Sequence, residues 1–358
     1  MTLRLFTSRL LGAAALAGFM TMGLSGPVAS QSAGATGLTV PARTLPVPGT
    51  VSPEVQKLIA APLRANWDLL PKTGEEWRPV AEAGAAATIK NLPGLAERLK
   101  VRWEKATIDG VRAFIVTPET VAPENRDRVL IHMHGGCYVL SPGEAGLPEA
   151  LFMAGMGRFK VISVDYRMPP EAPFPAALED GMAVWKATLK TTEPGRIAIF
   201  GTSAGGALTL SMALKAKQDG VPMPAAIAPG TPMSDVTKTG DTFYTNEMVD
   251  NVLVSRDGFC DAGAKVYANG RDMKDPLLSP VYGDMSGFPP TILTSGTRDL
   301  LLSNTVRVHR KLRLAGVEAT LQVYEGQSHA HYLRDDSAPE TKEVFGEIAA
   351  FFDRHMRK

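Results

Sequence analysis

The sequence predicts an α/β fold in which a mostly parallel central sheet carries helices on both faces. Short apolar runs rich in Val, Ile and Thr alternate with helical patterns over most of the chain. Buried strands separated by helices are typical of parallel sheets, because a parallel connection needs a crossover helix. One short run, Arg196–Phe200, leads through a G-x-S-x-G sequence directly into a helical stretch. That order of strand, tight turn and helix belongs to the same architecture.

The expected sheet begins near Trp103 with an antiparallel hairpin. Its strands, Lys105–Ile108 and Val111–Thr117, are joined by Asp109-Gly110, a pair that favours a tight hairpin turn. Further strands are expected at Val129–Met133, Phe159–Val164, Arg196–Phe200, Ala225–Ala228, Thr291–Thr294 and Thr320–Tyr324.

Helices are expected between most of these strands and at the end of the chain. Their ranges are Pro148–Met156, Pro175–Leu189, Ala204–Lys217, Asn304–Ala315 and Pro339–His355. Before the sheet, Ser52-Pro53 predicts a helix start, and a second helix is expected over Leu92–Leu99. These two helices fit either a core or a lid. Residues 231–275 contain no clear strand, only polar and helical sequence such as Asn251–Tyr267, and an insertion of this length predicts a lid.

The N-terminus has the order of regions of a secretory signal peptide. Arg4 and Arg9 precede the apolar run Leu10–Leu24, and small residues follow as far as Ser30. An uncleaved anchor is the less favoured interpretation, because the run is short and interrupted by glycine. Cleavage is expected after Ser30 or Ala35, which predicts an exported, periplasmic or secreted protein.

These patterns divide the chain into six parts. They are a signal peptide (1–30), a flexible linker (31–50), N-terminal cap helices (51–100), a first part of the α/β core (101–230), a cap insertion (231–275) and a second part of the core (276–358).

Composition excludes several classes of function. The 358 residues carry 38 Lys+Arg against 37 Asp+Glu, so no charge excess points to nucleic acid. The two cysteines, Cys137 and Cys260, are expected to be free thiols, although a disulfide between them stays open. No Cys/His spacing fits zinc, and no metal or organic cofactor is expected.

Ser203 is the candidate nucleophile. It is the serine of Gly201-Thr202-Ser203-Ala204-Gly205, between an expected strand and an expected helix. Small neighbours allow the strained backbone that exposes the hydroxyl, and the helix N-terminus directs N–H groups towards a reacting carbonyl oxygen. An ordinary strand-to-helix turn is the alternative interpretation.

A base and an acid are expected in later post-strand loops. His329 is preferred over His331 as the base, because it lies closer to the strand that ends at Tyr324. Asp299 follows the strand Thr291–Thr294 and a glycine turn, and is the expected acid, with a helix N-cap as its alternative role. Asp165 also ends a strand but precedes the serine, and eight further aspartates lie in or beside the insertion.

The stretch His134-Gly135-Gly136-Cys137 is the candidate oxyanion loop. It follows a strand and precedes the serine, and glycines let backbone N–H groups approach a substrate closely. Gly135, Gly136 and Cys137 are therefore expected to donate to the oxyanion together with the Ala204 N–H. His134 is expected to hold this loop in place rather than to carry a proton.

Three motifs make the chain resemble the bacterial hormone-sensitive-lipase-like esterases of the α/β-hydrolase superfamily. They are His134-Gly135-Gly136-Cys137-Tyr138, the long stretch from Asp165-Tyr166-Arg167 to Asp180, and Gly201-Thr202-Ser203-Ala204-Gly205-Gly206. The resemblance covers about residues 100–355, and Thr202 makes it similar to the branch with threonine before the nucleophile. Cys137 stands where the family usually has a third glycine, and Ser328-His329-Ala330-His331 departs from its more common His-Gly-Phe ending.

The resemblance implies an α/β-hydrolase fold with a helical cap, a Ser203–Asp299–His329 triad and an oxyanion hole formed by Gly135, Gly136 or Cys137 with Ala204. The expected activity is hydrolysis of short- to medium-chain carboxylic esters through an acyl-enzyme. A lactone or small-amide hydrolase and a non-catalytic binding protein are the alternatives. The expected partner is a small ester substrate. Nucleic acid and membrane insertion of the mature chain are not expected, and a homodimer is left open.

Overall fold

The computed structural model describes residues 37–357, and the predicted signal peptide lies outside them. The chain divides into two compact units, Met1–Pro46 and Val47–Lys358. The described residues of the first unit, 37–46, form no helix or strand. Everything that follows concerns the second unit. No helix in the described residues is long and apolar enough to cross a membrane.

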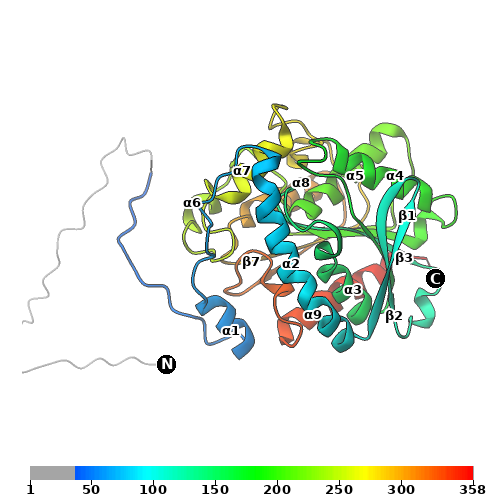
Figure 1. The fold of residues 1–358 in the computed structure, drawn as a ribbon, viewed down its shortest axis with the longest axis horizontal. Helices are drawn as coiled ribbons and strands as arrows, with labels where there is room; N and C mark the ends of the chain where they lie inside the picture. The colour runs from blue at the N-terminus through cyan, green and yellow to red at the C-terminus, as the bar shows by residue number, and fades with distance from the viewer. Residues whose placement is uncertain (1–36, 358) are drawn as a thin grey trace, which may run out of the picture. The chain divides into compact units, whose positions relative to one another are not determined.

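One eight-stranded sheet forms the centre of the second unit (Figure 1). Its strand order is β1-β2-β4-β3-β5-β6-β7-β8. β1 pairs with β2 and β2 with β4 in antiparallel fashion, and all other pairs are parallel. The bounds are β1 Val101–Ile108, β2 Val111–Pro118, β3 Val129–Met133, β4 Lys160–Val164, β5 Ile197–Thr202, β6 Ala226–Gly230, β7 Thr291–Gly296 and β8 Ala319–Tyr324. The mostly parallel sheet and all eight expected strands are thus confirmed.

Helices cover both faces of the sheet because each central strand is apolar on both sides. In β3, Ile131 and Met133 belong to one buried cluster with residues of α4 (Ala176–Thr188), α5 (Ala204–Asp219) and α8 (Leu302–Leu314). Leu130 belongs to the cluster on the opposite face, with α3 (Pro148–Gly157) and α9 (Pro339–His355). Alternate side chains of a strand point to opposite faces, so a continuous apolar run needs cover on both.

The N-terminal helices differ from expectation in length. α1 (Pro53–Ala60) begins as predicted, with the Ser52 hydroxyl accepting a hydrogen bond from the Val55 N–H at 3.2 Å. The second helix, α2, is much longer than Leu92–Leu99 and runs over Gly74–Leu99. Pro79 and Pro93 lie inside α2 and interrupt the sequence pattern that would have indicated its full length. In Figure 1, α2 crosses in front of the sheet.

The insertion after β6 contains less helix than its sequence suggests. It forms a single turn, α6 (Thr242–Thr245), and α7 (Phe259–Ala268), so the helix expected from Asn251 begins only at Phe259. The Asp250 carboxylate accepts hydrogen bonds from the N–H groups of Val252 and Leu253 at 2.8 and 3.1 Å. Such side-chain bonds compete with the helical pattern and stabilise a turn. The division of the chain into core and cap segments stays a prediction.

The parallel strands bring five loops to one edge of the sheet. Residues 134–137 follow β3, Ser203 follows β5, Thr231 follows β6, Asp299 lies just beyond β7, and His329 lies just beyond β8. The carboxyl ends of parallel strands share an edge, and this is where open α/β sheets bind ligands.

Candidate active site

Ser203 occupies a sharp turn between β5 and α5. Its backbone angles are φ 64° and ψ −120°, in a region that residues with a side chain rarely adopt. The turn is held by a hydrogen bond from the Ser203 N–H to the Gly230 carbonyl at 2.9 Å. Gly201 and Gly205 are required by close packing, because a Cβ on either would lie about 2 Å from the Met133 carbonyl oxygen (2.1 and 1.9 Å). The expected sharp turn between strand and helix therefore forms, and the role of Ser203 as nucleophile stays a prediction.

Asp299 and His329 are paired next to this turn. Nδ1 of His329 lies 3.1 Å from Oδ1 of Asp299, and both side chains are buried. Burial alone would raise the pKa of the Asp299 carboxyl. The charge of His329 and hydrogen bonds from His329, Thr231 and the Leu301 N–H outweigh burial, so that pKa is lowered. Asp299 is not a helix N-cap, because α8 begins at Leu302 with Leu301 at the cap position.

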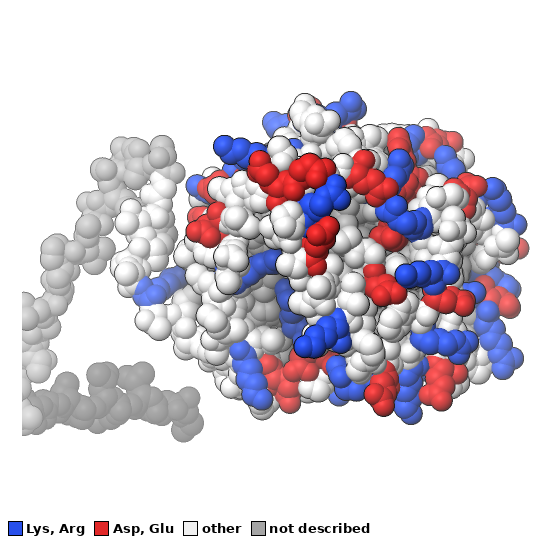
Figure 2. All heavy atoms as spheres, viewed as in Figure 1, with Lys and Arg blue, Asp and Glu red and all other residues white. Residues whose placement is uncertain are grey.

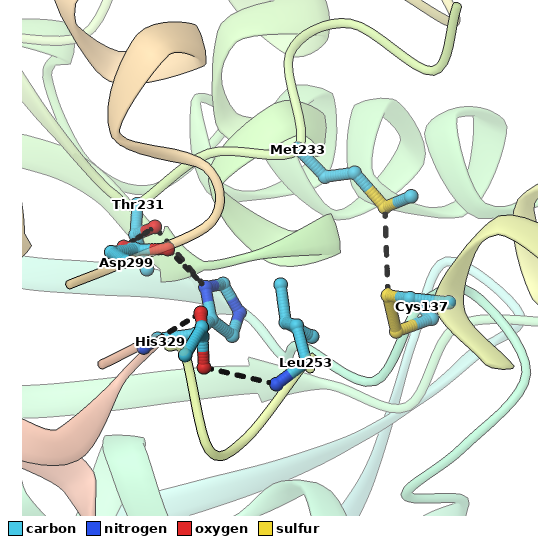
Figure 3. The surroundings of a disulfide bond; sticks show 8 residues. Cys137, Thr231, Met233, Leu253, Asp299 and His329 are labelled. Carbon is cyan, nitrogen blue, oxygen red and sulfur yellow. Dashed lines mark hydrogen bonds and ion pairs between the residues drawn. A yellow bond between two sulfur atoms is a disulfide. The ribbon is translucent and has the colours of Figure 1, made fainter. Parts of the chain in front are cut away.

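Two hydroxyl groups that sequence reasoning missed also hold the Asp299 carboxylate. Thr231 donates a short hydrogen bond to Oδ2, and its oxygen lies 3.2 Å from Nδ1 of His329. Ser295 donates to the same Oδ2 at 2.9 Å. Thr231 directly follows β6, so its place after a core strand was the one signal available in the sequence. Figure 3 shows Thr231, Asp299 and His329 together.

Asp250, from the insertion, ties the loops of the acid and the base together. Its Oδ2 accepts hydrogen bonds from the N–H of Leu300 at 2.8 Å and from the N–H of His329 at 3.3 Å. The side chain is fully buried. Burial, followed by the negative charge of Asp299, raises the pKa of Asp250 to about 6. The sequence contained Asp250 only as one of several aspartates in this region.

The glycine loop after β3 lies directly against Ser203. A Cβ on Gly135 would lie 2.8 Å from the Thr202 carbonyl oxygen and 3.3 Å from the Ser203 Cβ. Gly136, Cys137 and Tyr138 all have positive φ angles, of 118°, 53° and 64°. This unusual run turns the backbone of the predicted oxyanion loop beside Ser203, where α5 also presents the first N–H of its helix, that of Ala204.

Cys137 and Cys260 form a disulfide, so the expectation of free thiols is wrong. Their Cα atoms are 5.2 Å apart although 123 positions separate them in sequence. The fold packs α7 onto the glycine loop, a contact that cysteine spacing does not reveal. Beside the disulfide, a Cβ on Gly263 would lie 2.9 Å from the Cys137 carbonyl oxygen, and Tyr138 stacks on Tyr267 at 4.2 Å. The Cys260 sulfur also lies 4.0 Å from Met233 Sδ (Figure 3).

The other candidate groups serve structural purposes. Nε2 of His331 lies 2.9 Å from the side-chain oxygen of Asn251, and burial lowers the pKa of His331 to about 4. His134 stacks on Tyr166 at 4.0 Å, and its Nδ1 lies 2.7 Å from the Gly135 carbonyl oxygen. Burial lowers the pKa of His134 to about 4 as well, which fits the predicted holding role. Asp165 pairs with Arg112 at 3.1 Å.

A buried polar cluster lies next to the Ser203 turn. The Glu149 carboxylate accepts hydrogen bonds from the Thr202 hydroxyl at 2.7 Å and from the Thr202 N–H at 3.1 Å. It also lies 3.1 Å from Nε2 of His132, and the Thr202 hydroxyl lies 2.8 Å from that of Tyr332. Thr202, the residue before the nucleophile, is thus held at both its backbone and its side chain.

A cavity of about 520 Å³ brings these groups together. Its lining includes Ser203, His329 and the glycine loop. One wall is apolar, formed by side chains of α2, α3 and the glycine loop: Val80, Ala81, Leu92, Leu95, Leu140 and Phe152. In the described part of the chain, no group of three or more His, Cys, Asp and Glu side chains could hold a metal ion.

Comparison with known proteins agrees with this architecture. A family described as the alpha/beta hydrolase fold matches residues 130–333. An acetyl-hydrolase of Streptomyces hygroscopicus is 30% identical over 307 residues, which cover 84% of this chain and 96% of that protein.

Solved structures give the same result. The crystal structure of an esterase, E25, matches this chain with a TM-score of 0.87 and 43% sequence identity. The match covers 90% of this chain and 99% of the E25 chain. An esterase from the bacterial hormone-sensitive lipase family is 27% identical with a TM-score of 0.71, covering 86% and 99% of the two chains. The chain therefore belongs to the alpha/beta hydrolase fold family, among its hormone-sensitive-lipase-like members.

Proposed function

We propose that this protein is a serine carboxylesterase that hydrolyses short- to medium-chain esters through a Ser203–His329–Asp299 triad. The observation that carries the proposal is that His329, whose Nδ1 lies 3.1 Å from the buried Asp299 carboxylate, lines the same cavity as the strained Ser203 turn. The esterase and acetyl-hydrolase relatives support hydrolysis of a carboxylic ester. The cavity volume of about 520 Å³ lies within the usual range for sites that bind small molecules.

The reaction would proceed in two halves. His329 takes the proton of the Ser203 hydroxyl as the oxygen attacks the ester carbonyl, and Asp299 holds the imidazole and stabilises its positive charge. The N–H groups of Gly135, Gly136 or Cys137, with that of Ala204, stabilise the oxyanion, each by about 3 kcal/mol. His329 then gives its proton to the leaving alcohol as the C–O bond breaks. Water, activated by the same histidine, releases the acid and restores Ser203.

The test is hydrolysis of p-nitrophenyl esters from acetate to dodecanoate by the wild type and by Ser203→Ala. We expect turnover to be highest for the short esters and to fall by at least about 10⁴-fold in the variant, because the nucleophile is lost. A folded Ser203→Ala protein that kept full esterase activity would refute the proposal. Labelling by a fluorophosphonate in the wild type, but not in the variant, is the independent check.

A further inference from the structure

The rim of the catalytic cavity carries more positive than negative charge. Three arginines line it, Arg64, Arg98 and Arg334, together with one partly exposed carboxylate, Asp336. The other acidic residue of the lining, Glu149, is buried, and its carboxylate accepts hydrogen bonds from the N–H and the hydroxyl of Thr202. Figure 2 shows a hollow beside α2, with basic side chains inside it and along its edge.

Of these three arginines, Arg98 alone makes a direct ion pair with a carboxylate of the described residues. Arg98 makes a two-pronged ion pair with Asp336, at 2.7 and 2.9 Å. Within the described residues 37–357, neither Arg64 nor Arg334 makes an ion pair with a carboxylate. The Arg64 guanidinium instead lies over the Phe259 ring, 4.1 Å from its centroid, and this ring also lines the cavity. A guanidinium has five donors, so one without a carboxylate retains hydrogen bonds to offer.

Arg334 lies close enough to Arg64 for its charge to affect the pKa of Arg64. Partial burial and then the positive charge of Arg334 lower the pKa of Arg64. Burial lowers the pKa of Arg334 too, against the opposing effect of the Asp250 carboxylate. Despite this loss of hydration, Arg64 and Arg334 keep exposed surface, whereas Ser203 and His329 are buried. Two neighbouring cations above a reactive centre create a positive field that an anionic group would neutralise.

We propose that Arg64 and Arg334 form a subsite for a carboxylate carried by the ester substrate. This inference rests on the proposed esterase function and narrows its substrate class. Guanidinium groups match carboxylates in two-pronged geometry, and the apolar wall of α2 and α3 would hold the hydrocarbon part of the same molecule. The substrate class is then an ester with an apolar middle and a negatively charged end, on either the acyl or the alcohol side.

Two matched pairs of esters test the proposal and separate the two sides. Mono-p-nitrophenyl adipate against p-nitrophenyl hexanoate places the charge on the acyl part. 4-Acetoxybenzoate against 4-acetoxybenzamide places it on the leaving group. The measured quantity is the ratio of kcat/KM for the charged ester to that for the neutral one. We expect the wild type to favour the charged ester in at least one pair.

The variants Arg64→Gln, Arg334→Gln and their combination identify the subsite. We expect the double variant to lower the kcat/KM ratio about ten-fold, as loss of a charge-assisted contact would. Arg310→Gln, on α8 and outside the cavity lining, removes the same charge elsewhere and should keep the wild-type ratio. If a glutamine variant fails to fold, Arg64→Lys and Arg334→Lys replace it in the same measurement. These variants keep the positive charge but lose the two-pronged geometry of the guanidinium group, so the ratio should still fall.

Two results would overturn the subsite. One is a wild type that favours the neutral ester in both pairs, and the other is an unchanged ratio in a folded double variant. Both can occur while neutral esters are still hydrolysed in a Ser203-dependent way, which leaves the esterase proposal intact. Hydrolysis of neutral esters by Ser203→Ala would instead remove the proposed function itself.

Discussion

At the scale of single residues, the site depends on how many groups bind each carboxylate. Asp299 has His329, Thr231, Ser295 and the Leu301 N–H around it, so its negative charge is stabilised in a buried position. Asp250 lies close by and is surrounded by backbone N–H groups. Yet burial and the charge of Asp299 raise the pKa of Asp250, whereas that of Asp299 is lowered. The pKa values of two neighbouring carboxylates are therefore shifted in opposite directions.

This difference predicts a pH dependence of stability that belongs to Asp250. Its pKa of about 6 in the folded protein exceeds the ordinary value of 3.8, so the folded state binds the proton more tightly than the unfolded state does. The resulting stabilisation is fully present below the ordinary value and is lost as the pH rises through about 6. We expect the wild type to gain free energy of unfolding, relative to Asp250→Asn, as the pH falls from about 7.5 to about 4.5.

Urea unfolding of both proteins across that pH range measures the effect. The asparagine side chain does not titrate, and its NH₂ group would face the Leu300 or the His329 N–H, so the variant should also be less stable at every pH. Stability curves that run parallel for the two proteins would show that Asp250 has no raised pKa.

At the scale of elements, α7 and the glycine loop behave as one unit. The Cys137–Cys260 disulfide joins them, Gly263 allows their backbones to approach, and Tyr138 stacks on Tyr267. Tyr267 in turn accepts a hydrogen bond from the Phe174 N–H at its carbonyl, at 2.8 Å. The insertion is thereby attached to the loop that would bind the oxyanion, and this loop lines the cavity.

Opening the disulfide should therefore destabilise the protein. The bond closes a loop across 123 positions, and a bridge of this kind contributes about 2 to 4 kcal/mol by restricting the unfolded chain. We expect Cys137→Ala/Cys260→Ala to unfold at a clearly lower temperature than the oxidised wild type. Thermal unfolding with and without dithiothreitol makes the comparison.

The reductant also supplies the control for this prediction. Both cysteines are buried, with exposures of 3% and 6%, so reduction should be complete only when the protein is partly unfolded. Dithiothreitol should lower the unfolding temperature of the wild type towards that of the double variant, and should leave the double variant unaffected. An equal unfolding temperature for the oxidised wild type and the double variant would contradict the prediction.

Across the whole molecule, the features that depend on a few neighbouring residues could be predicted from the sequence. The strands, the Ser52 helix start, the Ser203 turn and the order Ser203, Asp299, His329 all follow from short patterns read along the chain. Thr231, Asp250 and the disulfide could not be predicted in this way. Thr231 bonds to Asp299, Asp250 to Leu300, and Cys137 to Cys260. The two residues of each pair are 50 or more positions apart in the sequence, and only the tertiary fold brings them together.

Two features of the whole chain bear on the compartment in which the protein folds. The predicted signal peptide would direct it out of the cytoplasm, and disulfides form and persist in oxidising compartments such as the periplasm. The first feature comes from the N-terminal residues alone and the second from the fold, so they are independent of each other. An exported protein with a closed disulfide between α7 and the glycine loop accounts for both.

We therefore expect the full-length protein, expressed in a Gram-negative host, to be recovered from the periplasm as a shortened chain. Mass spectrometry should give a new N-terminus after Ser30 or Ala35, and alkylation without reductant should modify neither cysteine. The matched control starts at Gln31, behind a new initiator methionine, and folds in the reducing cytoplasm. It should carry two free thiols and unfold at a lower temperature until it is oxidised. Recovery of the full-length protein with Met1 still attached would contradict export by cleavage, whereas a shortened periplasmic chain with free thiols would contradict only the disulfide.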